Sequence, residues 1–130
     1  MPVNPIREGF HTITPYLMVP GAANLIEFVK QAFGATELYR DTGSAGGMHA
    51  EVRIGDSMLM IGGTLNTEAM PAAIYLYVED VDTIYRRALQ AGATSIAEPA
   101  DQPYGDRNAG VKDSFGNIWY IATHKEDVPL

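Results

Sequence analysis

Two spacings of apolar residues alternate along the chain and outline its elements. The run TITPYLMV, residues 12–19, is rich in β-formers, and apolar side chains then recur at helical spacing over residues 21–33 until Gly34 ends the pattern. Three short strand-like runs follow, with the sequences TELYRDT, MHAEVRI and SMLMI. Pro15 favours an edge position or an irregular first half for the first run. The pattern therefore predicts a strand, a helix and three further strands.

The second half of the chain repeats this order. A strand with the sequence AIYLYVE precedes a helix that Asp80 can cap and Gly92 ends, and three extended segments follow. Both helices end in Gly-Ala-Thr, and the two glycines lie 92 − 34 = 58 residues apart. We interpret the chain as a duplication of the α+β class, in which two βαβββ modules form an open, cupped, barrel-like groove with the helices outside. The expected bounds are about 11–63 for module one, 64–72 for a linker, 73–124 for module two and 125–130 for a tail.

Size and charge narrow the classes of partner. The chain has 130 residues, of which 46% are apolar, and no cysteine, so we expect one domain over residues 1–130 without disulfides. Nine Lys and Arg against sixteen Asp and Glu give 9 − 16 = −7, a charge that repels nucleic acid and anionic lipid. The sequence shows no signal-like N-terminus and no run of about 18 apolar residues. We expect a cytoplasmic protein that binds neither nucleic acid nor membranes.

Tyrosine and methionine side chains line the predicted groove, because strand alternation directs them to its faces. Tyrosine offers a flat apolar ring with a polar tip, and methionine adapts its shape to irregular partners. This lining suits a planar, partly polar organic molecule, although the same side chains could simply fill the space between the sheets. The expected lining residues are Thr14, Tyr16, Met58, Met60, Tyr75, Tyr77 and Tyr120.

The third strand supplies polar groups to the same groove. His49, Glu51 and Arg53 alternate with apolar residues and so share one face. His49 and Glu51 could exchange a proton with a ligand, orient it by hydrogen bonds, or form an ordinary exposed pair. As metal sites, His49 with Glu51 and His124 with Glu126 both lack a third ligand in the sequence. We expect no metal and no cofactor, and His49 and Glu51 are only candidates for catalysis.

A turn before the seventh extended segment adds two further candidates. Tyr104 could stack at the mouth of the groove, and Arg107 could clamp an anionic group of the ligand. Arg107 could equally form an internal salt bridge with Asp106 or Glu51. The glycine-rich stretch 43–47 is interpreted as a flexible loop that could act as a lid.

Several stretches resemble a known family. They are ITPYLMV, IEFVKQAFGATELYR, MHAEVRIGDSMLMI, LYVEDVDTIYRRALQAGA and YGDRNAGVKDSFGNIWYIATHKEDV. Together they resemble the vicinal oxygen chelate (VOC) superfamily of glyoxalase I, extradiol dioxygenases and bleomycin resistance proteins, and within it the PhnB-like branch. The resemblance implies a paired βαβββ fold and a homodimer. It also implies that the metal-ligand positions of chelating members fall at Thr14, Met60, Ala73 and Tyr120, which are poor ligands for divalent cations.

These observations favour a metal-independent, small-molecule binding protein of the sequestering, bleomycin-resistance type. Tyrosines would form the walls, with His49, Glu51 and Arg107 as polar anchors. The alternative is a VOC-type enzyme, a lyase, isomerase or dioxygenase, that uses relocated metal ligands or acid–base catalysis by His49 and Glu51. A third interpretation is a housekeeping protein whose groove serves only as a dimerisation core. The sequence does not decide between binding and catalysis.

Overall fold

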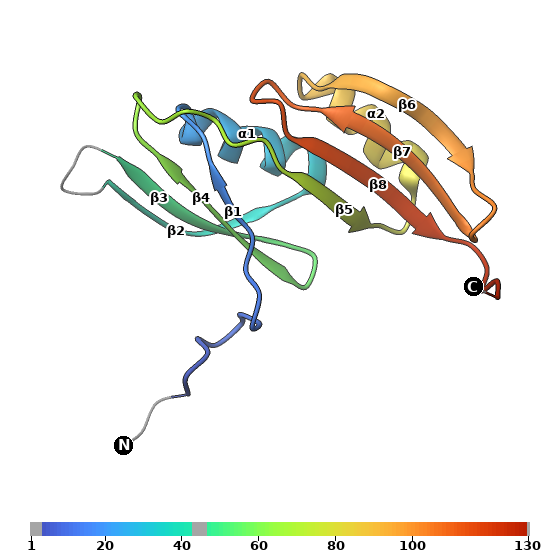
Figure 1. Cartoon of the computed structure of the whole chain (residues 1–130), viewed down its shortest axis with the longest axis horizontal. Coiled ribbons are helices and arrows are strands. Elements are labelled where there is room, and N and C mark those ends of the chain that lie inside the picture. Colours follow the sequence, from blue (N-terminus) through green and yellow to red (C-terminus); the bar gives the residue numbers. More distant parts are fainter. Residues whose placement is uncertain (1–3, 43–46, 130) are drawn as a thin grey trace. The chain divides into compact units, whose positions relative to one another are not determined.

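The chain forms two sheets and two helices within the residues that the computed structural model describes, 4–42 and 47–129. The first half contains β1 (Tyr16–Met18), α1 (Ala22–Phe33), β2 (Thr36–Thr42), β3 (Met48–Ile54) and β4 (Ser57–Gly63). The second half contains β5 (Ala73–Tyr77), α2 (Val81–Gln90), β6 (Thr94–Asp101), β7 (Asp106–Lys112) and β8 (Ile118–His124). The strand orders are β1-β4-β3-β2 and β5-β8-β7-β6 (Figure 1). The α+β class with two four-stranded sheets is confirmed.

The chain divides into two compact units between Met70 and Pro71, within the expected linker. Unit one runs to Met70, except that Gln31–Phe33 group with unit two. In each unit the first strand pairs in parallel with the last, and the other neighbours are antiparallel. The two units therefore share one topology, as a duplication requires.

The first strand is shorter than the sequence pattern predicts. β1 contains three residues instead of the eight of TITPYLMV, and it lies at the edge of its sheet. Pro15 has no N–H to give to a ladder, although its carbonyl accepts a hydrogen bond from Met60 N at 2.9 Å. Thr14 consequently lies in coil before the strand. The expected strand over residues 12–15 was wrong, and the edge position follows from the same proline.

Strand alternation separates a buried face from an open face in unit one. Leu17, Val52 and Ile61 are fully or almost fully buried and lie in the core together with the apolar face of α1. The other face carries Tyr16 and Met60, which are direct register partners. The open face is the one that can meet a ligand.

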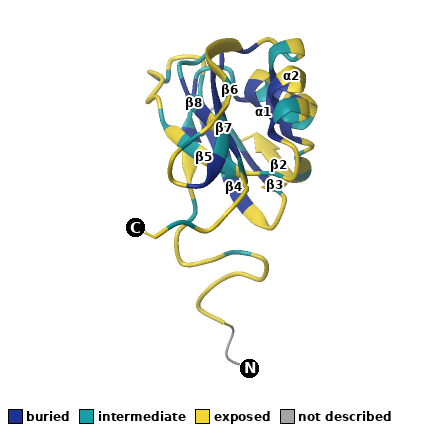
Figure 2. Ribbon diagram, turned by 90° about the vertical axis from the view of Figure 1, so that its right-hand side faces the viewer, coloured by how far each residue is buried: buried dark blue, intermediate teal, exposed yellow. Residues whose placement is uncertain are grey.

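Helix α2 is fixed at its start by side-chain caps. The Asp80 carboxylate accepts a hydrogen bond from Thr83 N, as the sequence predicts, and Thr123 Oγ1 accepts one from Val81 N. The helix packs along β6, β7 and β8, on one side of their sheet (Figure 2). This packing leaves the opposite face of the sheet open.

A buried carboxylate organises the turn that leads into β8. Asp113 accepts hydrogen bonds from the backbone of Phe115 and Asn117 and from the side chains of Asn117 and Trp119, at 2.9 to 3.0 Å. Trp119 is fully buried, and its ring centroid lies 4.9 Å from that of Phe33. The turn thus fixes the entry of the strand that later carries Tyr120 and His124.

Two expectations concern segments away from the sheets. The stretch interpreted as a lid lies mostly at 43–46, outside the described residues. Within the described ranges neither helix, of 12 and 10 residues, has the length and apolarity needed to cross a membrane.

Replacing Asp113 by Ala should lower the free energy of unfolding by about 3–5 kcal/mol, because four donors around a buried acceptor lose their partner. Urea denaturation followed by circular dichroism measures this loss. Asp56→Ala removes an exposed carboxylate and should change stability by no more than about 0.5 kcal/mol. Equal losses in the two variants would contradict the assigned role of Asp113.

Candidate functional site

The open face of unit one carries a chain of polar contacts that we call the Glu51 cluster, formed by Arg7, Tyr16, His49 and Glu51. Glu51 is only 4% exposed, and the Arg7 guanidinium donates to both of its carboxylate oxygens, at 2.8 and 2.9 Å. His49 Nε2 lies 3.2 Å from Glu51 Oε2, and His49 Nδ1 lies 3.0 Å from Tyr16 Oη. The cluster therefore links an exposed phenol to a buried carboxylate through one imidazole.

The direction of these hydrogen bonds follows from the chemistry of the groups. A carboxylate can only accept, so His49 donates its Nε2–H to Glu51. Nδ1 of the neutral ring is then an acceptor, and the Tyr16 hydroxyl donates to it. Hydrogen bonds from Arg7 hold the pKa of Glu51 below its ordinary value, against the opposing effect of burial. Glu51 is thus an anion throughout the neutral pH range.

The position of the Tyr16 hydroxyl depends on a glycine. A Cβ at Gly62 would lie 2.8 Å from Tyr16 Oη and 2.8 Å from the carbonyl oxygen of Met48. Gly62 is the register partner of His49, so the phenol reaches across the missing side chain to the imidazole. A larger residue at this position would collide with both groups. The carbonyl belongs to the strand backbone and cannot shift easily, so the Tyr16 side chain would be the group displaced.

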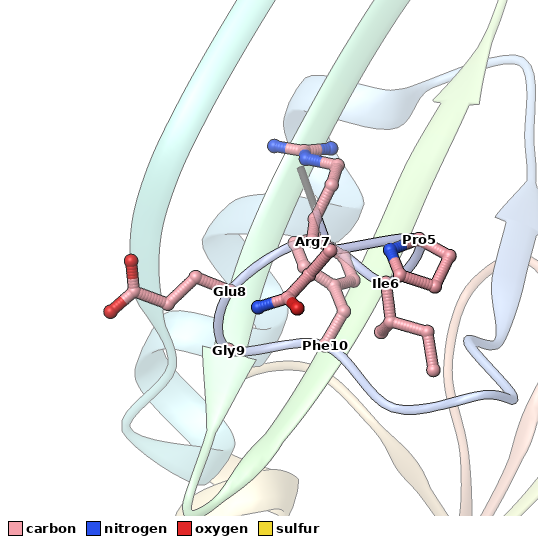
Figure 3. A pocket seen from close by; sticks show the side chains of 7 residues that line it. Pro5, Ile6, Arg7, Glu8, Gly9 and Phe10 are labelled. Atoms are coloured by element: carbon pink, nitrogen blue, oxygen red, sulfur yellow. The ribbon is translucent and has the colours of Figure 1, made fainter. Parts of the chain in front are cut away.

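Arg7 comes from an N-terminal segment that sequence analysis did not connect to the site. Residues 4–10 line a hollow of about 380 Å³ (Figure 3). Arg7 is one of its lining residues, and its guanidinium lies 4.6 Å above the centroid of the Phe10 ring. Because all of its walls belong to one short segment, we do not regard the hollow as a ligand site.

The open face of unit two carries four tyrosines, which we call the tyrosine face. Their exposed fractions range from 39% to 66%. The Tyr75 ring centroid lies 5.3 Å from that of Tyr77, in an edge-to-face pair, and 6.0 Å from that of Tyr120, in a stacked pair. The fourth member is Tyr104, from the turn before β7.

One buried carboxylate fixes the polar ends of this face. Asp106 is 5% exposed and accepts hydrogen bonds from Tyr75 Oη at 2.7 Å, Tyr77 Oη at 3.1 Å and His124 Nδ1 at 2.8 Å. The Asn108 amide donates to the hydroxyls of Tyr75 and Tyr104, at 3.1 and 2.8 Å. Since Tyr75 and Tyr77 give their protons to Asp106, the hydroxyl oxygen of the more exposed Tyr77 faces solvent as an acceptor.

The electrostatics of the tyrosine face keep this arrangement in place at neutral pH. Burial raises the pKa of Tyr75 to about 12, so the phenol remains a donor. Hydrogen bonds from His124 and Tyr75 lower the pKa of Asp106, and those to Asp106 and Asp127 raise the pKa of His124. His124 and Asp106 thus stabilise each other as an ion pair.

Two of the expected site residues lie elsewhere, and a third lies on the expected face but is buried. Arg107 pairs with Asp82 of α2 and with Asp101 on β6, so it is directed to the helix side of its sheet and cannot clamp a ligand beside the tyrosines. Its expected partners, Asp106 and Glu51, were also wrong. Thr14 lies in coil, and Met58 is buried although it shares the open face of unit one.

The remaining expected residues occupy the faces that alternation assigns to them. Tyr16, Met60, His49 and Glu51 share the open face of unit one, and Tyr75, Tyr77 and Tyr120 share that of unit two. The sequence interpretation missed Arg7, Asp106 and Asn108 as partners of these groups. The alternation of β7 could have found the last two, since Asp106 and Asn108 are two residues apart.

No arrangement of three or more His, Cys, Asp or Glu side chains suited to a metal ion occurs among residues 4–42 and 47–129. Met60 and Tyr120, two of the positions that the resemblance assigns to metal ligands, instead pair with Tyr16 and Tyr75 across their sheets. His124, which could have joined Glu126, is hydrogen-bonded to Asp106 and Asp127.

Comparison with known proteins places this fold in a family. The sequence profile of the Glyoxalase/Bleomycin resistance protein/Dioxygenase superfamily matches residues 9–121. The chain belongs to this superfamily. An uncharacterised protein of Mycobacterium bovis is 37% identical over 131 residues, which cover 91% of this chain and 86% of that protein.

Two further relatives have named roles or sources. The anthracycline biosynthesis protein DnrV of Streptomyces peucetius is 30% identical over 137 residues, which cover 95% of this chain and 49% of DnrV. The crystal structure of TioX from Micromonospora sp. ML1 matches with a TM-score of 0.72 and 24% identity, over 88% of this chain and 98% of that one. The likeness to TioX establishes the fold, the superfamily rests on the profile match, and neither fixes the chemistry.

The His124–Asp106 pair should make stability depend on pH. The raised pKa of His124 gives stability that is complete below its unfolded-state value of 6.5 and is lost as pH rises through the folded-state value. The lowered pKa of Asp106 gives stability that is complete above 3.8 and is lost as pH falls through its folded-state value. The difference in stability between the wild type and His124→Gln should therefore be largest between roughly pH 4 and pH 6.5.

Urea titrations at a series of pH values measure this difference. His11→Gln, which removes an exposed histidine from the coil before β1, is the matched control. A difference between the wild type and His124→Gln that stays constant across pH would contradict the ion pair.

After incubation with Zn, Ni, Mn or Fe(II) and desalting, elemental mass spectrometry should find far less than one metal per chain. The physical reason is that thioether and phenol groups occupy two of the positions that the resemblance assigns to imidazole or carboxylate ligands. One tightly bound metal per chain would contradict this expectation and direct attention to glyoxalase and dioxygenase assays.

Proposed function

We propose that this protein binds planar organic molecules that carry hydrogen-bond donors, without a metal, on the tyrosine face of unit two. The observation that carries the proposal is the set of exposed tyrosine rings whose hydroxyls are held by the buried Asp106 and by Asn108. A site of this kind is preorganised, because its polar ends do not need to be ordered when the ligand arrives.

The rings supply the apolar part of recognition. Tyr75, Tyr77 and Tyr120 form contiguous aromatic pairs, and each remains substantially exposed. Large exposed aromatic side chains gathered on one face are typical of binding surfaces. A planar ligand can stack on these rings and remove apolar surface of both partners from water.

The hydroxyls supply the polar preference. The Tyr77 hydroxyl donates its proton to Asp106, so its oxygen accepts hydrogen bonds from a ligand amine, amide or hydroxyl. The negative faces of the rings and the net charge of −7 favour a cationic group over an anionic one. DnrV, by its name, takes part in anthracycline biosynthesis, and this likeness supports a small-molecule role.

The resemblance to the PhnB-like branch, the homodimer and the cytoplasmic location stay predictions. A homodimer also offers the competing function for the tyrosine face, since exposed tyrosines are frequent at interfaces. A face buried in a dimer would bind no ligand. Sedimentation of the protein with and without the planar dye proflavine separates ligand binding from dimerisation.

Proflavine, a planar cation with two amino groups, is a suitable probe. Its fluorescence should change saturably with protein concentration, and Tyr120→Ala should weaken the affinity roughly tenfold through lost stacking, about 1.4 kcal/mol. Tyr39→Ala removes a similarly exposed tyrosine from unit one and should leave the affinity unchanged. Absence of saturable binding, or equal affinity of Tyr120→Ala and the wild type, would overturn the proposal.

A second pair of measurements tests the donor preference. Tyr77→Phe keeps the ring and removes the acceptor oxygen, so it should weaken proflavine binding while leaving binding of anthracene carboxylate, a planar anion, unchanged. Equal effects on both probes would show that the hydroxyl does not select donors.

A further inference from the structure

We propose that the Glu51 cluster of unit one is a proton-transfer site, in which Tyr16 acts as a general acid–base catalyst on an enolisable ketone. This inference goes beyond ligand binding and does not depend on it, because it rests on a different sheet and on different residues. The chemistry of the site restricts the substrate: a phenol that passes its own proton to an imidazole can take one from an acidic bond of the substrate, and the C–H bond next to a ketone carbonyl is of this kind.

The geometry provides an uninterrupted path for one proton. Tyr16 Oη donates to His49 Nδ1 at 3.0 Å, and the opposite nitrogen of the same ring donates to Glu51 Oε2 at 3.2 Å. This is the arrangement of a hydroxyl, a base and an orienting carboxylate. Both ends are held, since Glu51 is fixed by two bonds from Arg7 and Tyr16 by the backbone of β1.

Exposure decides which group meets the substrate. Tyr16 is 44% exposed, whereas Glu51 is almost fully buried. Gly62 leaves room for the phenol beside His49, so the hydroxyl lies at the surface of the sheet with its proton directed to the imidazole. A substrate therefore contacts the Tyr16 oxygen, and His49 and Glu51 act through it.

The step balances without any co-reactant. The C–H bond next to the ketone carbonyl breaks, and its proton passes to Tyr16 Oη as the Tyr16 proton passes to His49 Nδ1. The electron pair of the C–H bond moves into the carbonyl, which becomes an enolate. The reverse transfer returns a proton to the carbon or to the oxygen and restores the neutral imidazole. The imidazolium formed in between is stabilised by the Glu51 carboxylate.

Within the described parts of the two sheets, the proton-transfer role is assigned to unit one alone, and a comparison with unit two shows why. In unit one Tyr16 pairs with Met60, and His49 lies opposite the residue two positions after Met60. In unit two Tyr75 pairs with Tyr120, and Asn108 lies opposite the residue two positions after Tyr120. Asn108 therefore takes the place of His49 in the repeat. An amide cannot accept a proton at neutral pH, so the same framework in unit two binds without transferring protons.

Deuterium exchange into β-tetralone, an aromatic ketone with acidic α-protons, tests the proposal by proton NMR in D₂O. The wild type should exceed the buffer rate at least tenfold, and Tyr16→Phe and His49→Gln should each remove most of that acceleration, in keeping with the ~100-fold or larger effects typical of acid–base groups. Tyr39→Phe, which removes a hydroxyl from the neighbouring strand, is the matched control and should keep the full rate.

Chemical rescue separates proton transfer from a structural role. Added imidazole should restore exchange to His49→Ala, because a free base can occupy the space of the lost ring, and it should not restore Tyr16→Phe. Circular dichroism verifies that each variant is folded. A wild-type rate equal to that of Tyr16→Phe, or equal losses in Tyr39→Phe and Tyr16→Phe, would overturn the proposal.

The outcome is independent of the proposed binding function. Tyr16→Phe should leave proflavine affinity unchanged, since that probe is assigned to unit two. Exchange activity without proflavine binding would refute the tyrosine face alone, and proflavine binding without exchange would refute the proton-transfer site alone.

Discussion

A carboxylate taken out of water must be surrounded by donors, and this constraint shapes both open faces of the protein. Glu51 and Asp106 are both nearly inaccessible to solvent, yet each carries at least two hydrogen bonds from other side chains. The donors are aromatic and cationic side chains drawn from neighbouring strands and from the N-terminal segment. Satisfying each buried charge thus fixes the very tyrosines and histidines that are available for chemistry.

The duplicated framework solves this problem twice with different residues. In unit one an imidazole stands between phenol and carboxylate, whereas in unit two the phenols of Tyr75 and Tyr77 bind the carboxylate directly. The first arrangement leaves a path for proton movement, and the second fixes hydroxyl dipoles. One topology therefore supports two chemical behaviours, in keeping with a superfamily in which fold does not determine reaction.

The sequence predicted most of the fold, because the spacing of apolar residues, the glycines that end helices and the helix caps are local signals. It also placed His49 and Glu51 correctly on one face with Tyr16, since alternation along a strand needs no tertiary knowledge. It failed for Arg7, which reaches Glu51 across 44 residues from a segment without periodicity. Arg107 was misassigned for a related reason: its partner Asp82 depends on how α2 packs and its partner Asp101 on how β6 pairs with β7, and no local pattern encodes either.

The short β1 has a consequence for motion. Leu17 at its centre is only 2% exposed, and the hydrogen bond from Met60 N to Pro15 O extends its pairing with β4 beyond the strand. Detaching β1 would bring a core side chain into water, so we expect its opening to cost far more than the fraying of an exposed edge. The contact between Tyr16 and His49 should therefore last as long as the core beneath it, and open only when unit one itself opens.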